Sequence, residues 1–161
     1  MMDKIDENRV REFWDNGMSI ACGQTLFEYL REEDRPIWAS NVLKTMAELA
    51  GIQLAEIDEA IDLARTPNRW PEGHLMFDKL RTMLLRLSWE PQSRDDHALT
   101  KKLISLAELT AKVSYNATNP PDAFDDDNGW YIPNATFKIV GIIDGEAVAD
   151  KVVRALASCL F

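Results

Sequence analysis

The hydrophobic pattern of the first two-thirds of the chain has the three-to-four-residue period of amphipathic helices. Residues 36–50 show it most clearly, since their apolar side chains fall on one stripe: Ala39, Val42, Leu43, Met46, Leu49 and Ala50. Pro36 suits the first turn of this helix, and Gly51 suits a left-handed cap at its end. The same period predicts helices over residues 3–15, 22–33, 53–65, 72–88, 95–116 and 146–160.

The connections between these helices differ in length and composition. The short link at Gly51 predicts that the helices over 36–50 and 53–65 form an antiparallel hairpin. Residues 66–71 hold two prolines and an asparagine, so we expect the helical run to break there. Residues 89–93 contain a proline and read as a loop.

The pattern changes after residue 116. An acidic, proline-containing stretch over 117–135 reads as an exposed loop, and the apolar, β-branched residues 136–143 fit either a strand or a helix. As a strand, this segment would pair with 129–132 in a short β-hairpin near residues 129–143. The sequence therefore predicts a mainly α protein of six or seven helices in a single domain. Its parts are a helical core (1–116), the loop (117–135) and a C-terminal strand or helix followed by a helix (136–161), which together span 1–161.

Charge narrows the classes of partner. The 161 residues carry 27 acidic and 18 basic side chains, a net charge of −9. Residues 1–64 hold 14 acids and 6 bases, whereas residues 65–112 hold 6 acids and 9 bases. The acidic average repels nucleic acid and anionic lipid, and the basic excess in the middle is modest and mixed with acids. A basic protein partner fits this charge better than a nucleic acid or a membrane does.

Two further observations indicate the compartment. The chain has no stretch of 18 apolar residues, and its first residues lack the apolar core of a secretory signal. Its only cysteines, Cys22 and Cys159, are far apart in the sequence, which favours reduced thiols. We therefore expect a cytoplasmic protein.

A candidate partner-binding surface follows from the acidic residues of the third and fourth predicted helices. Five acids and no base lie between Lys44 and Arg65: Glu48, Glu56, Asp58, Glu59 and Asp62. Trp130 and Tyr131 stand in a predicted loop, where large aromatics either anchor a partner or plug the end of a bundle. The leading hypothesis is a small acidic protein-interaction module, of the immunity-protein, antitoxin or chaperone kind, that occludes a basic partner surface. A structural or regulatory homodimer is an alternative.

Catalytic motifs are absent from the sequence. It has no Gly-x-Ser-x-Gly elbow, no phosphate-binding glycine loop and no His-Glu-x-x-His, so no catalytic residue and no cofactor is predicted. The rival hypothesis is a small-ligand binder or metal-dependent enzyme with a pocket between helices. Its candidate polar residues are His74, Asp78, Tyr115, Asn116, Asp125, Asp126 and Asp127. The aspartate run does not fit an EF-hand, because Ala135 stands where the loop needs its bidentate glutamate.

Overall fold

The described part of the chain is helical and contains no strand. The computed structural model describes residues 12, 13, 15, 16, 18, 23, 25–28, 30–89, 96–118 and 128–143. Its α-helices are α3 (Arg35–Ala50), α4 (Ala55–Ala64), α5 (Gly73–Trp89), α6 (Asp96–Thr118) and α7 (Asn128–Ile143). Short 3-10 helices at Glu32–Asp34 and Pro67–Glu72 precede α3 and α5. The prediction of a mainly α bundle is confirmed.

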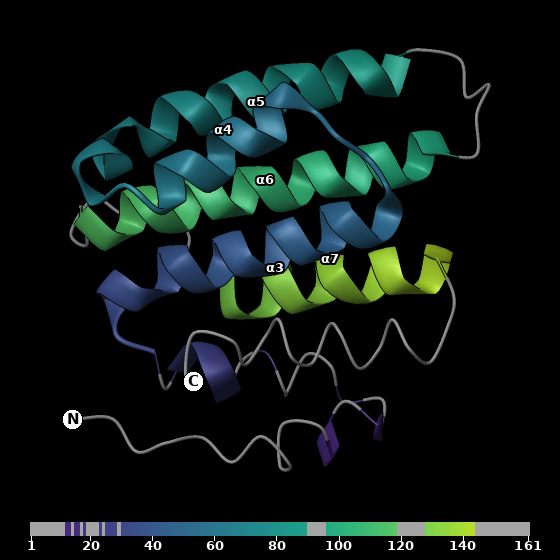
Figure 1. Cartoon of the computed structure of the whole chain (residues 1–161), viewed down its shortest axis with the longest axis horizontal. Helices are drawn as coiled ribbons and strands as arrows, with labels where there is room; N and C mark the ends of the chain where they lie inside the picture. The colour runs from purple at the N-terminus through teal and green to yellow at the C-terminus, as the bar shows by residue number, and fades with distance from the viewer. Residues whose placement is uncertain are drawn as a thin grey trace.

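The long helix α6 lies in the middle of the bundle (Figure 1). It forms an antiparallel hairpin with α5 and also contacts α3, α4 and α7. Because neighbours surround it, apolar side chains are buried on several of its sides: Leu103, Ile104, Leu106, Ala107, Ala111 and Val113. The same position buries two charged residues of α6, Glu108 and Lys112.

The predicted hairpin of α3 and α4 is confirmed. Gly51 ends α3 with φ 67° and ψ 28°, a left-handed conformation that costs glycine little. Its N–H donates to the carbonyl of Glu48, and the N–H of Ile52 donates to the carbonyl of Ala47. These two bonds satisfy carbonyls that the end of a helix otherwise leaves without partners.

Two tryptophans fix the ends of these helices. Trp38 on α3 is fully buried, and its ring meets that of Phe27 edge to face with centroids 5.8 Å apart. Trp70 lies in the segment predicted as a break, which ends α4 and forms a 3-10 helix rather than a loop. The buried Nε1 of Trp70 donates to the carbonyl of Ala64 at 2.9 Å. Trp70 therefore closes the end of the bundle next to α4.

Residues 128–143 form the single helix α7. This agrees with the helix alternative for 136–143, but it corrects the prediction of a loop over 128–135 and of a β-hairpin near 129–143. Pro133 breaks the backbone hydrogen-bond pattern of a helix, which is why the sequence favoured a loop. Packing outweighs that cost, because Ile132 and Ile139 are fully buried at helical spacing. A Cβ on Gly23 would overlap the Pro133 ring, so the two residues are in close contact.

Several predictions concern segments outside the described residues. They are the helix over 146–160, most of the helix over 3–15, part of the helix over 22–33, both cysteines, and the aspartates Asp125, Asp126 and Asp127. The described residues near the N-terminus that adopt helix are 12, 13, 15, 23 and 25–28. Among the described helices, none combines the length and the apolar character that crossing a membrane requires.

Candidate functional site

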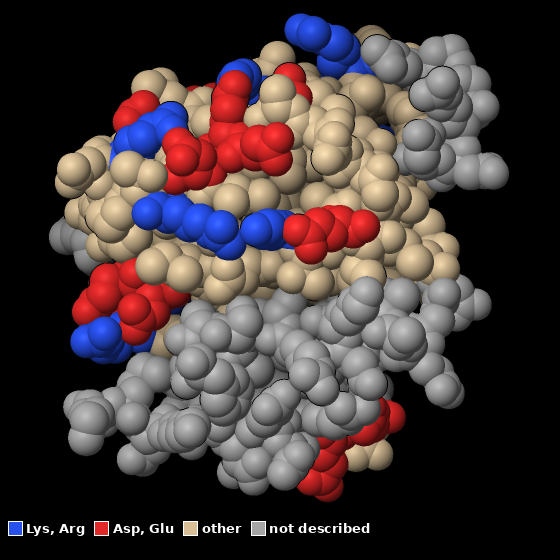
Figure 2. All heavy atoms as spheres, in the orientation of Figure 1, with Lys and Arg blue, Asp and Glu red and all other residues tan. Residues whose placement is uncertain are grey.

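Three of the five predicted acids line one groove between α3 and α4. The groove has a volume of about 650 Å³, and we call it the α3–α4 groove. Its acidic residues are Glu48, Asp58 and Asp62. Its other lining residues are Lys44, Ala47, Gly51, Ile52, Gln53, Ile57, Ile61 and Arg65. Figure 2 shows acidic side chains gathered over α4, with basic side chains between them and α3.

Two of the five acids are neutralised by neighbouring cations. Glu59 accepts a hydrogen bond from Lys79 of α5 at 2.8 Å, which raises the pKa of that ammonium group. Asp62 pairs with Arg69 at 2.6 Å. The other three acids, Glu48, Glu56 and Asp58, make no ion pair within the described residues. The negative charge available to a partner is therefore smaller than the five residues suggest.

Arg65 is held against α3 rather than extended across the groove. Its Nε donates to Ser40 Oγ at 3.1 Å, and its Nη2 donates to Asn41 Oδ1 at 2.7 Å. These hydrogen bonds join the end of α4 to α3. Lys44 also lines the groove, and both cations are exposed.

The residues proposed for a ligand or metal pocket are only partly brought together. The rings of His74 and Tyr115 lie 5.3 Å apart, and His74 Nδ1 is 3.2 Å from the carbonyl oxygen of Pro71. Asp78 is exposed one turn further along α5, and Asn116 follows Tyr115 on α6. In the described ranges, no three His, Cys, Asp or Glu side chains group in a way that could hold a metal ion.

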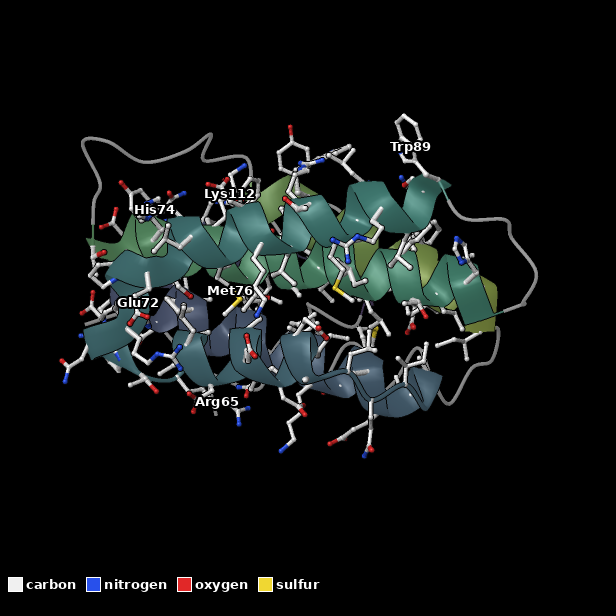
Figure 3. The ribbon with its side chains drawn as sticks, turned by 90° about the horizontal axis from the view of Figure 1, so that it is seen from above. Arg65, Glu72, His74, Met76, Trp89 and Lys112 are labelled. Atoms are coloured by element: carbon white, nitrogen blue, oxygen red, sulfur yellow. The ribbon has the colours of Figure 1, made fainter. Side chains whose placement is uncertain are left out.

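The predicted aromatic anchors lie on α7, away from the α3–α4 groove. The rings of Trp130 and Tyr131 meet edge to face with centroids 5.2 Å apart, and Trp130 is 39% exposed. The Lys112 ammonium lies 5.4 Å from the centroid of the Tyr131 ring. Figure 3 shows Lys112 and Arg65 on opposite sides of the bundle. The acids and the aromatics therefore do not form one continuous surface.

A second hollow lies between α5, α6 and α7, and the sequence did not predict it. This α5–α7 cavity has a volume of about 380 Å³. Its charged lining residues are Arg81, Lys102, Glu108, Lys112 and Lys138. Its other lining residues are Phe77, Leu84, Ser105, Leu109, Tyr131, Asn134 and Ala135. Four cations thus surround one carboxylate in a protein of strongly negative net charge.

The carboxylate of this cavity is almost completely buried. Glu108 is 4% exposed, and its Oε2 lies 3.0 Å from Arg81 Nε without accepting a hydrogen bond from a described residue. Burial raises the pKa of Glu108, while the nearby charges of Arg81 and Lys112 oppose that shift. Nearby cations therefore balance the charge of Glu108, but water has little access to its carboxylate.

The signal for this cavity was present in the sequence but incomplete. The basic excess of residues 65–112 includes Arg81, Lys102 and Lys112. Lys138 joins them only because residues 128–143 form a helix that packs on α6. Comparison with known proteins offers no assignment for either hollow, since no family model, curated protein or solved structure matches this chain.

Proposed function

We propose that the protein is an interaction module, of the immunity-protein, antitoxin or chaperone kind, whose α3–α4 groove receives a basic segment of a partner protein. The observation that carries this proposal is the placement of Glu48 and Asp58, which form no ion pair with a described residue, and of the paired Asp62 around one open groove of about 650 Å³. A groove of this size is large enough to take several side chains of a bound segment. Binding in this groove would cover the most basic surface of the partner.

The lining of the groove suits an amphipathic basic segment. Ile52, Ile57 and Ile61 supply apolar surface, of which Ile57 is buried and the other two are partly exposed. A lysine or arginine that lays its aliphatic stem on such a surface can place its charged end at a carboxylate. The exposed Lys44, which unlike Arg65 makes no hydrogen bond to a described residue, sets the register by repelling a basic residue placed against it.

The charge of the whole chain supports the same partner. A net charge of −9 attracts a basic protein from a distance and speeds the encounter, more so at low ionic strength. Capture of the partner is therefore expected to weaken as salt is added. The apolar contribution of the isoleucines does not weaken in the same way.

The test is affinity purification with quantitative identification of captured proteins. The variant Asp58→Asn removes one unpaired carboxylate from the groove, and Asp78→Asn makes the same chemical change on the exposed side of α5. We expect a basic partner whose capture falls about three- to tenfold with Asp58→Asn and is unchanged with Asp78→Asn. A captured partner that responds neither to salt nor to Asp58→Asn would contradict the proposal.

A further inference from the structure

We infer that the α5–α7 cavity is a separate binding site, which takes the phosphate group of a small phosphorylated molecule. This site is independent of the α3–α4 groove, because the two hollows share no lining residue and lie on opposite sides of the bundle (Figure 3). The inference rests on charge, burial and the shape of the available donors.

The first argument is the surplus of positive charge. Arg81 is paired with Glu108, but Lys102, Lys112 and Lys138 form no ion pair with any described residue. The three ammonium groups come from two different helices, α6 and α7. A site with three cations outside any described ion pair around one cavity is suited to an anion that carries more than one negative charge.

The second argument is that these cations destabilise one another. Burial lowers the pKa of Lys102, and the nearby charges of Lys138 and Lys101 lower it further. Like charges that outnumber the single carboxylate described in this cavity cost free energy in the empty site. A bound anion removes that repulsion, and the relief adds to the free energy of binding.

The third argument is the burial of Lys112. Only 9% of this residue is exposed, and its ammonium group faces the ring of Tyr131 rather than a carboxylate within ion-pair distance. The side chain is largely covered, while its ammonium group keeps its hydrogen-bond donors for acceptors that enter the cavity. Phosphate oxygens would supply them, and the Tyr131 ring would hold the ammonium group in place before the ligand arrives.

The donor types accommodate a phosphate group. The planar guanidinium group, which matches carboxylate and phosphate alike, belongs to Arg81 and is already paired with Glu108. What remains are lysine point charges, which accommodate a tetrahedral phosphate, together with the polar groups of Ser105 and Asn134.

The rest of the lining indicates the kind of molecule that carries the phosphate. Phe77, Leu84, Leu109 and Tyr131 give the cavity an apolar side. A volume of about 380 Å³ is at the small end of the range for ligand pockets. The ligand class is therefore a phosphate monoester with a compact apolar or aromatic group, for which phenyl phosphate is a suitable probe.

The experiment is a calorimetric titration of the full chain with phenyl phosphate at constant ionic strength. Saturable binding is expected for the wild type. Lys112→Gln should weaken it about tenfold or more, as expected for loss of one charge-assisted hydrogen bond. Glu108→Gln should tighten it, because that variant removes the only carboxylate among the described residues that line the cavity. The matched control Lys44→Gln makes the same change in the α3–α4 groove and should leave the affinity unchanged.

Further variants and ligands keep the test decisive. If Lys112→Gln does not fold, as judged by circular dichroism, the exposed Lys138→Gln replaces it, and it should also weaken binding. The inference is wrong if phenyl phosphate does not bind saturably at millimolar concentration, if Lys44→Gln weakens binding equally, or if Glu108→Gln weakens it. Benzoate that binds as tightly as phenyl phosphate would overturn the assignment to phosphate. Binding to phosphatidic acid vesicles without binding to the soluble ester would overturn the assignment to a small molecule.

Discussion

Gly73 allows α5 and α6 to approach closely, and a single methyl group there should separate them. A Cβ on Gly73 would lie 2.5 Å from the carbonyl oxygen of Ala111 and 2.9 Å from the backbone nitrogen of Tyr115. Both atoms belong to the backbone of α6, so neither can turn aside as a side chain can. Gly73→Ala therefore requires the start of α5 to move away from α6.

The size of the effect follows from the overlap. Ordinary contacts begin at 3.4 Å, so the Cβ···O approach is too short by about 0.9 Å. Overpacking of this kind costs ~1–3 kcal/mol. The backbone of Gly73 is already helical (φ −57°, ψ −35°), so alanine suffers no conformational penalty and recovers part of the cost, up to ~1 kcal/mol. We expect a net loss of about 1–2 kcal/mol in the free energy of unfolding.

Gly141 provides the matched control, because the same substitution there meets nothing. No heavy atom of the described part of the chain lies within 4 Å of a Cβ built on Gly141, an exposed residue near the end of α7. Gly141→Ala should therefore leave stability unchanged or raise it by up to ~1 kcal/mol. Urea unfolding followed by circular dichroism at constant m-value measures both variants. Equal stabilities of the two variants would refute the reasoning.

Three other substitutions test the core, a helix end and a buried carboxylate. Leu103→Ala, at a fully buried position of α6, should lower the free energy of unfolding by ~2–5 kcal/mol in the same urea assay. Trp70→Phe removes the donor to the carbonyl of Ala64 and should lower the free energy of unfolding by ~1–2 kcal/mol. An unchanged free energy of unfolding would show that this carbonyl does not depend on Trp70. Because burial raises the pKa of Glu108, the native state keeps a proton that the unfolded chain releases, and stability falls as the pH rises from the ordinary glutamate pKa through the raised one. Glu108→Gln should therefore gain stability relative to the wild type across that interval, and parallel pH profiles of the two proteins would contradict the shift.

Local signals were sufficient to predict the hairpin of α3 and α4. The apolar stripe of α3 has the helical period, and Gly51 is a residue suited to the left-handed cap that the chain adopts. Both signals act within a few residues of the turn. No information about distant parts of the chain was needed.

The helix α7 could not be predicted in this way. Gly129 and Pro133 both disfavour a helix locally, and the helix forms because Ile132 and Ile139 are buried in the core of the bundle. A Cβ on Gly129 would lie 3.2 Å from atoms of Phe27, a contact with a residue about one hundred positions earlier. Sequence periodicity does not report such contacts.

The candidate sites were likewise predicted only where their residues are close together in the sequence. The acids of α3 and α4 were found because they cluster in sequence, whereas their pairing with Lys79 and Arg69 depends on how α5 and the 3-10 helix pack. The α5–α7 cavity combines residues from three helices. It was missed because Lys138 lies in the segment left open between strand and helix, and because sequence spacing does not show that Glu108 is buried.

The central position of α6 has a consequence for how the protein opens. Every other described α-helix contacts α6. If α6 unfolds, each of these helices therefore loses part of the core that it packs against. The molecule should therefore lack an independently folding half, and its slowest backbone amide exchange should be found in α6 and proceed only through global unfolding. Fluctuations that admit solvent would begin at the outer helices, which each lose fewer neighbours on detaching.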